Sequence, residues 1–217
     1  MGYFWYEVRR QKWWFLVLVI IGIFKMYGAG RYDRINCGED TVSILLAFYL
    51  GRILSRADEV ELVKSSATSV WRVFYTRLVV GYLYAFLVVM VFNIIGTLQC
   101  GEGIYEFMIV EISYVAVSFA MVAFAVFVRL LTGNTYVSHI LVFAYNVMDM
   151  ELHFMMLLKQ ISKDYMLFDK GITSYNFNRT LWGVNRGIFI AAGVIFLGLG
   201  ILLFRSRFAR KEHRYAD

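Results

Sequence analysis

The sequence predicts an all-α, polytopic integral membrane protein with six transmembrane helices and both termini in the cytoplasm. Apolar residues make up 60% of the 217-residue chain and its mean hydropathy is +0.60, which exceeds what the core of a soluble protein needs. These residues gather in runs long enough to cross a bilayer. The basic residues, which give a formal charge of +6, cluster beside these runs instead of forming an extended patch, so we expect no nucleic-acid partner.

Six apolar segments are expected to cross the membrane as one domain. A helix needs roughly 20 residues to cross a hydrocarbon layer of about 30 Å, and tilt gives some latitude. The third, fourth and sixth segments are long and almost free of charge, whereas Lys25 interrupts the first and only eleven residues of the second precede Arg52. No small-residue cleavage site follows the first segment, so we interpret it as a span and not as a secretory signal. The expected spans are residues 13–30, 41–57, 77–98, 107–129, 135–158 and 186–204.

Lysine and arginine set the expected orientation, because positive residues are retained on the cytoplasmic side of a membrane. With both termini inside, 14 of the 22 basic residues lie in inner segments. The outer basic residues are accompanied by acids, among them Asp33, Glu39 and Asp40. Without the second span the two termini would lie on opposite sides, which fits the charges less well. We therefore expect a multi-pass protein of the plasma membrane.

One hydrophilic segment, residues 58–72, lies between the second and third expected spans on the cytoplasmic side. Its sequence ADEVELVKSS starts with acids, which favour the N-terminus of a helix, and ends at Lys64 with two serines, where a short helix would stop. We expect a two-turn helix at the membrane surface. Val60, Leu62 and Val63 would supply its apolar contacts.

This segment resembles one in the permease subunits of type-2 ATP-binding-cassette (ABC) exporters. In that family a short helix follows a charged patch at the end of the second span, and a serine, an aromatic and a basic residue open the third span. An amphipathic basic N-terminus, six spans and a short basic tail extend the resemblance to the whole chain. Ala67 stands where the family has proline, a departure that bears on the tightness of the turn. The matching residues are Glu61, Leu62, Val63, Ser65 or Ser66, Ser69, Trp71 and Arg77.

The resemblance implies that residues 58–72 form a coupling helix, which sits in a groove of a separate ATPase and carries its closure into the membrane. The partners would be an ABC ATPase subunit, a second copy of the chain or a related permease, and the lipid bilayer. The alternative is that the segment merely rests on headgroups, as basic and aromatic residues favour. The residues expected to contact the ATPase are Glu59, Glu61, Leu62, Val63, Lys64, Ser65, Ser66 and Trp71.

The chain is expected to be non-catalytic by itself. It contains no GxxxxGK(S/T) phosphate-binding loop and none of the HExxH or GxSxG motifs of hydrolases. We expect no cofactor and no metal site, and we expect the partner to hydrolyse ATP and so drive export of a hydrophobic or amphipathic peptide, lipid or drug. The alternatives are a secondary transporter coupled to ions or protons, and a structural or assembly subunit of a membrane complex.

Polar and ionisable side chains inside the expected spans are candidates for a transport pathway, because a charged group costs about 2.5 to 3.5 kcal/mol at the bilayer centre. In the fifth span two histidines and an asparagine recur every seven residues, and an aspartate shares their side of the helix. This polar seam is either the wall of a pathway or a surface that packs against other helices. The same two interpretations apply in the third and fourth spans. The candidates are Asn93, Glu111, His139, Asn146, Asp149 and His153.

Small residues predict close helix packing in two of the spans, because they let backbones approach one another. The fourth span has one such face and the sixth has another near its start. These faces consist of Ser113, Ala116, Ala120 and Ala123 in the fourth span, and of Gly183, Gly187 and Ala191 in the sixth.

The segments expected outside contain the two cysteines and an aromatic-rich loop. Cys37 in the first loop and Cys100 in the second either form a disulfide or are unrelated thiols, and sequence alone does not decide between these. Residues 159–185 carry more apolar and aromatic side chains than a free loop needs. The resemblance implies a pair of short re-entrant helices there, and the residues themselves are also consistent with an interfacial segment anchored by aromatic rings.

Reporter fusions test the expected orientation. A reporter that works only in the cytoplasm should be active when it is fused after Asp217, because the basic residues near the C-terminus are retained inside. A C-terminus found outside the cell would contradict the six-span topology.

Overall fold

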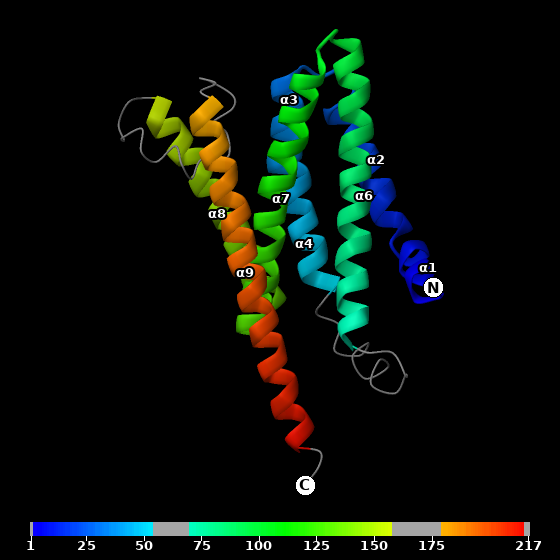
Figure 1. The fold of residues 1–217 in the computed structure, drawn as a ribbon, viewed down its shortest axis with the longest axis vertical. Helices are drawn as coiled ribbons and strands as arrows, with labels where there is room; N and C mark the ends of the chain where they lie inside the picture. Colours follow the sequence, from blue (N-terminus) through cyan, green and yellow to red (C-terminus); the bar gives the residue numbers. More distant parts are fainter. Residues whose placement is uncertain (1, 54–69, 158–178, 215–217) are drawn as a thin grey trace.

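The computed structural model describes residues 2–53, 70–157 and 179–214, and every regular element in these ranges is helical (Figure 1). The prediction of an all-α fold is therefore confirmed for the described part of the chain. Its elements are α1 (Gly2–Arg10), α2 (Lys12–Lys25), α3 (Arg31–Asn36), the π-helix η1 (Cys37–Val42), α4 (Ser43–Ile53), α6 (Val70–Gln99), α7 (Ile104–Thr132), α8 (Thr135–Leu157) and α9 (Arg179–Arg214).

Three of these helices are long and apolar enough to cross a membrane, and they indicate a membrane protein. They contain the segments Arg72–Gln99, Ile104–Thr132 and Trp182–Leu203. Of the other expected spans, α2 has 14 residues and α4 has 11, which is short for a crossing. Helix α8 has 23 residues, but it carries Asp149 and Glu151 near its C-terminal end. Within the described ranges, length and composition thus support three spans and leave the expected six open.

Several helices extend beyond the expected spans. The second expected span was placed at residues 41–57, but α3, η1 and α4 follow one another without a break from residue 31 to residue 53. Helix α6 begins at Val70, and α9 begins at Arg179 inside the expected outer loop of residues 159–185. The reason is that hydropathy marks only the part of a helix that lipid surrounds, whereas backbone hydrogen bonding continues until a cap or a turn stops it.

The π-helix η1 is the irregular part of this long helical segment. Its wider turns are closed by i→i+5 hydrogen bonds, and the Ser43 hydroxyl donates to the Gly38 carbonyl at 2.7 Å. Gly38 lies against α7, because a Cβ at this position would be 3.4 Å from the Cβ of Tyr114. The widened turn therefore lies where the two helices approach each other closely.

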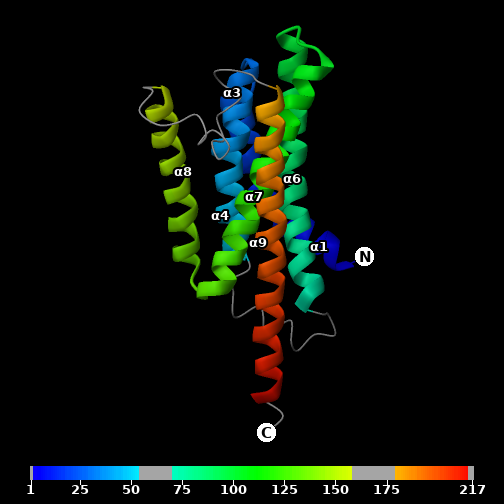
Figure 2. The same cartoon turned by 60° about the vertical axis from the view of Figure 1, so that its left-hand side comes forward.

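Successive helices run in alternating directions (Figures 1 and 2). Helices α2, α6 and α8 rise in these views, whereas α4, α7 and α9 descend, and α1 lies beside the lower half of α6. Helix α7 is central, since it packs against α4, α6, α8, α9, α3 and η1. In its most apolar stretch of 18 residues, 56% is buried, whereas the corresponding share for α9 is 22%. Helix α7 is thus the core of the bundle, and α9 lies at its edge.

Both ends of α7 are defined by local chemistry. At its start the Gly103 amide donates to the Glu106 carboxylate at 3.1 Å, which satisfies one of the free donors of the first turn. At its end Gly133 adopts the left-handed conformation with φ of 72°, and its amide donates to the Arg129 carbonyl at 3.0 Å. The turn from α6 also uses a left-handed glycine, Gly101, with φ of 65°.

Helix α7 packs through the small face that the sequence predicts. Its Ser113, Ala116, Ala120 and Ala123 are all buried, which agrees with that prediction. The predicted small face at the start of α9 is wrong, because Gly183, Gly187 and Ala191 are exposed. The close approach occurs one to two turns later, at Gly193, where a Cβ would lie 3.3 Å from the Ala120 Cα. The start of α9 contributes Asn185, Arg186 and Phe189 to the interior instead.

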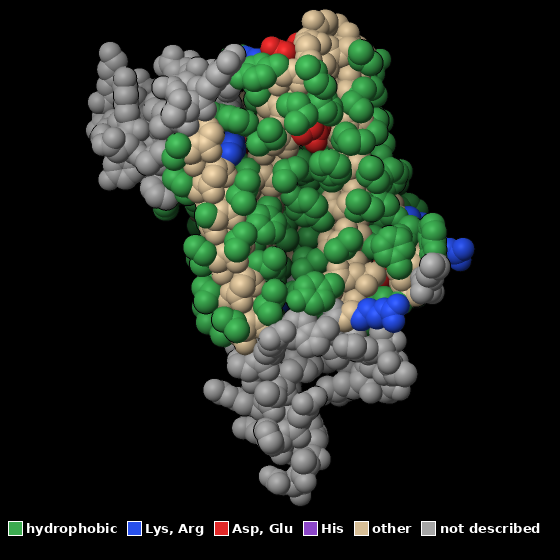
Figure 3. All heavy atoms as spheres, viewed as in Figure 1, with side chains coloured by type: hydrophobic (Ala, Val, Ile, Leu, Met, Phe, Trp, Pro, Cys, Tyr) green, Lys and Arg blue, Asp and Glu red, His purple; other side chains and the backbone are tan. Residues whose placement is uncertain are grey.

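The outer face of the bundle is apolar. Figure 3 shows hydrophobic side chains over the middle of the visible face and charged side chains mainly near its ends. Helix α6 contributes a stripe of exposed apolar residues at helical spacing, which suits contact with lipid tails. This stripe consists of Tyr75, Val79, Leu83, Leu87, Val91, Ile94 and Leu98.

Substitution of Gly193 tests the close contact between α7 and α9. Gly193→Leu should lower the thermal unfolding midpoint of the detergent-solubilised protein, because its side chain would meet Phe119 and the backbone of Ala120. Overpacking of this kind costs about 1 to 3 kcal/mol. Gly198→Leu on the same helix is the matched control, since nothing lies within 4 Å of a Cβ there. Equal midpoints for the two variants would contradict the packing.

Candidate functional site

The expected coupling segment lies mostly outside the described residues. Its flanks are described: α4 ends at Ile53 and α6 begins at Val70, with Trp71 in the first turn of α6. Both flanks lie at the lower end of the bundle, where the C-terminal end of α9 also lies (Figure 1). The expected ATPase contacts that fall outside the described part of the chain are Glu59, Glu61, Leu62, Val63, Lys64, Ser65 and Ser66.

At this lower end a buried ion pair attaches α1 to α6. Glu7 is 0% exposed, and its Oε1 lies 3.0 Å from the Nε of Arg77. The Tyr3 hydroxyl donates to the same oxygen at 2.5 Å, and the Gln11 amide donates to Oε2 at 3.3 Å. Burial and the hydrogen bond to Glu7 raise the pKa of Tyr3 to about 12. We call the set Tyr3, Glu7, Gln11 and Arg77 the α1 clamp.

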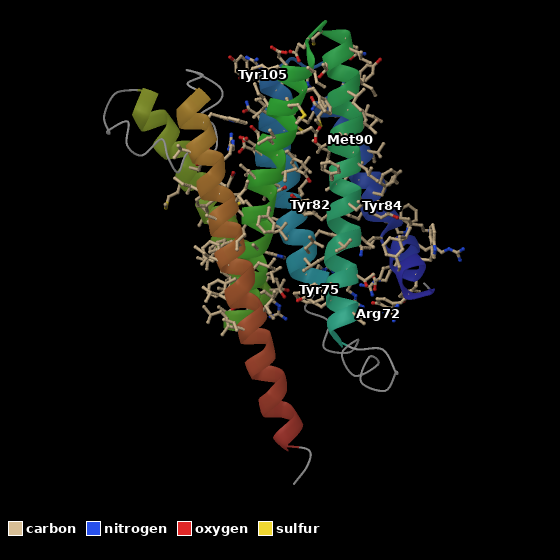
Figure 4. All side chains as sticks on the ribbon, in the orientation of Figure 1. Arg72, Tyr75, Tyr82, Tyr84, Met90 and Tyr105 are labelled. Carbon is tan, nitrogen blue, oxygen red and sulfur yellow. The ribbon has the colours of Figure 1, made fainter. Side chains whose placement is uncertain are left out.

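Tyrosines on α6 add contacts on opposite sides of this helix (Figure 4). The Tyr84 hydroxyl donates to the Val8 carbonyl of α1 at 2.8 Å. The Tyr82 hydroxyl is 2.6 Å from the Ser118 hydroxyl of α7. Helix α6 is therefore joined to α1 on one side and to the central helix on the other.

A second polar cluster lies at the upper end of the bundle, around Arg34 of α3. The Arg34 side chain is fully buried and forms an ion pair with Glu102, which lies in the turn between α6 and α7. Its Nε also donates to the Asn93 Oδ1 at 3.2 Å, and its Nη1 donates to the Ala29 carbonyl at 2.7 Å. The guanidinium thus connects α3 to α6 and to the turn that follows it.

Two of the predicted pathway residues extend this cluster into the bundle. The Asn93 amide donates to the Glu111 Oε1 at 2.9 Å and to the Phe107 carbonyl at 3.1 Å. The other oxygen of Glu111 is buried and has no hydrogen-bond partner among the described residues. The structure therefore brings Asn93 and Glu111 together, with Arg34 and Glu102 on their outer side.

A third buried pair joins η1 to α9. The Nη2 of Arg186 is 2.6 Å from the Oε1 of Glu39, and both side chains are 2% exposed. Close by on α9, the Trp182 indole donates to the Ser113 hydroxyl of α7 at 3.2 Å. These contacts hold the first turns of α9 against the helices that surround α7.

The polar seam on α8 faces other helices. His139 packs on the Phe48 ring of α4, and its Nε2 is 3.1 Å from the Phe48 carbonyl. Asn146 and Asp149 are buried. The side chain of His153 lies outside the described residues. The described part of the seam therefore contacts protein, and both the pathway and the packing interpretation stay predictions.

The two cysteines are both free in the structure. Cys37 is buried within η1, whereas Cys100 is exposed at the end of α6. The disulfide between them stays a prediction, alongside the interpretation as two unrelated thiols. In the described ranges no group of three or more His, Cys, Asp or Glu side chains could hold a metal ion.

The buried ion pairs were not predicted from the sequence. Arg34 and Glu39 lie between the first and second expected spans, and Arg77 and Arg186 are the first residues of the third and sixth. A usable signal was present, since charges of both signs lie within a few residues of the helix ends. Nothing in a single sequence says which opposite charge each of them meets.

The fold and the site define an α-helical membrane protein whose polar groups lie in paired clusters near both ends of the bundle. A comparison of the chain with protein-family models, with curated proteins and with solved structures finds no match.

A double-mutant cycle tests the pair between η1 and α9. Glu39→Leu and Arg186→Leu should each lower the unfolding free energy by about 3 to 5 kcal/mol, because each leaves one buried charge without its partner. The double variant should lose much less unfolding free energy than either single variant, because no unpaired charge stays buried. Thermal unfolding in detergent measures all three variants. Arg31→Leu is a control near the same end of the bundle, and single variants as stable as this control would contradict the pairing.

Proposed function

We propose that the chain is the membrane-spanning permease subunit of an ATP-driven ABC exporter, with ATP hydrolysis in a separate subunit. One observation carries this proposal: the two helix ends that flank residues 54–69 lie at the same end of the bundle as the basic end of α9. Basic segments are retained in the cytoplasm. We therefore propose that the hydrophilic segment joined at that end meets a cytoplasmic ATPase.

The proposed topology has six spans with both termini cytoplasmic. The alternating helix directions support it. Helices α2, α4, α6, α7, α8 and α9 follow one another along the chain, and each runs opposite to the one before it. The short helix α4 then spans together with α3 and η1, with which it forms one continuous segment. Helix α1 precedes α2, and the single non-helical residue Gln11 separates the two. On this topology the protein is a multi-pass protein of the plasma membrane.

The α1 clamp supports a mechanical role for the lower end. Arg77 lies two turns into α6, close after the coupling segment of residues 58–72, and its partner Glu7 is fully buried. A force on the coupling segment therefore acts on α6 and α1 together. Tyr82 carries the connection onward to α7, through its contact with Ser118. Movement at the ATPase would reach the central helix by this route.

The exposed apolar face of α6 supports a proposal for the substrate class. We propose a hydrophobic or amphipathic molecule, with Asn93 and Glu111 as the polar residues nearest its path. Two copies of the chain, or one copy and a related permease, would enclose that path.

A secondary transporter coupled to protons or ions is the alternative. The buried Glu111 oxygen without a hydrogen-bond partner among the described residues favours it. Transport in proteoliposomes decides between the two: uptake driven by ATP and the copurified ATPase supports the exporter, whereas uptake driven by a pH gradient alone supports the alternative. Purification of the native complex without any ATPase would also count against the exporter.

A charge reversal in the coupling segment tests the proposed ATPase contact. Glu61→Lys combined with Leu62→Ala should release the ATPase or abolish its stimulation, while membrane insertion stays unchanged. Copurification and stimulated ATP hydrolysis are the measurements. Asp33→Lys combined with Tyr32→Ala is the matched control, since both residues are exposed on α3 at the opposite end. Undiminished stimulation in the Glu61 and Leu62 variant would contradict the coupling role.

A further inference from the structure

Helix α1 and the start of α2 present a surface of exposed aromatic side chains. Trp5 is 61% exposed and Trp13 is 68% exposed, and Phe4 and Tyr6 are exposed beside them. Tryptophan and tyrosine prefer the interface between headgroups and acyl chains, where a ring can be half in lipid and half in water. The composition of this surface therefore suits the boundary of a membrane.

The charge of this surface differs from what the sequence of α1 suggests. Glu7 is the only acidic residue before Asp33, and the α1 clamp removes it from the surface, because its carboxylate is paired with Arg77 and is fully buried. The exposed charges of α1 and of the start of α2 are therefore all positive.

The basic side chains of this region lie at the lower end of the bundle. Arg9 and Lys12 are exposed, and so is Arg72 in the first turns of α6. Within the described part of the chain, no ion-pair partner contacts Arg9, Lys12 or Arg72, and the Lys12 ammonium lies over the Trp13 ring at 5.5 Å. In Figure 3 basic side chains appear at the lower right, over α1 and the lower end of α6, below hydrophobic side chains. Figure 4 places Arg72 at that end of α6.

We propose that this surface, formed by Trp5, Arg9, Lys12, Trp13 and Arg72, is a binding site for anionic phospholipid headgroups of the adjacent leaflet. The aromatic rings lie at the acyl boundary, and the basic side chains meet the phosphates. A basic residue near an anionic leaflet contributes about fivefold in affinity. Zwitterionic lipids lack the net negative charge, so these basic residues add little to their affinity.

Contacts to α6 preorganise the site. The ion pair between Glu7 and Arg77 and the Tyr84 contact to Val8 fix the rotation of α1 about its axis, so the aromatic and basic side chains point away from the bundle in a defined direction. A free amphipathic helix would have to order itself on binding, whereas this surface is already arranged.

Titration of lipid into the detergent-solubilised full-length protein tests the site. Dioleoylphosphatidylglycerol should raise the thermal unfolding midpoint of the wild type at lower concentration than dioleoylphosphatidylcholine does. The variant Arg9→Gln with Lys12→Gln should need roughly 25-fold more phosphatidylglycerol for half of the shift, because two basic residues are lost. Lys25→Gln with Arg31→Gln, at the opposite end, should respond as the wild type does.

Three outcomes would overturn the proposal. The first is equal shifts with the two lipids, and the second is an Arg9 and Lys12 variant that titrates like the control. The third is an equal shift with inorganic phosphate, which would mean that a free anion and not a lipid is bound. Both substituted residues are exposed, so the variant should unfold at the wild-type midpoint before lipid is added. Quenching of tryptophan fluorescence by brominated phosphatidylglycerol, reduced in Trp5→Leu, would independently support contact at this surface.

Discussion

A charge buried in an apolar bundle must be paired or hydrogen-bonded, and the arrangement of this protein depends on that constraint. Arg34, with no exposed surface, meets Glu102 and Asn93, while Arg186 meets Glu39 and Arg77 meets Glu7. Each pair joins elements that are distant in sequence: α3 to the turn after α6, η1 to α9, and α1 to α6. Lipid tails give no hydrophobic drive for helices to associate, so these pairs help to decide which helices are neighbours.

Close packing around α7 completes this arrangement. Small residues on α7 admit α9 at Gly193, and Gly38 of η1 lies against Tyr114. Glu39 of η1 forms its ion pair with Arg186 of α9 beside these contacts. Packing against α7 and charge pairing therefore both hold η1 and α9 in place.

The pair between Glu7 and Arg77 at the lower end contributes both to the proposed coupling to an ATPase and to the proposed lipid site. It attaches α1 to the base of α6, which would carry a motor's force, and it also removes the one acid from the surface that would meet anionic lipid. The two consequences have separate physical origins. The first comes from a contact between helices, and the second comes from the net charge of what remains exposed.

The sequence by itself determined the all-helical class, the three most apolar helices and the buried small face of α7, because hydropathy and periodicity are local properties. It also identified Asn93 and Glu111 as polar groups of interest, although not their mutual hydrogen bond. Tertiary structure alone decided that Arg34, Glu39 and Glu7 are buried, that α9 approaches α7 at Gly193 instead of Gly187, and that the seam at His139 meets α4. The reason is physical: a charge or a small residue acquires its role from the partner across the helix interface, and that partner is set by packing in three dimensions.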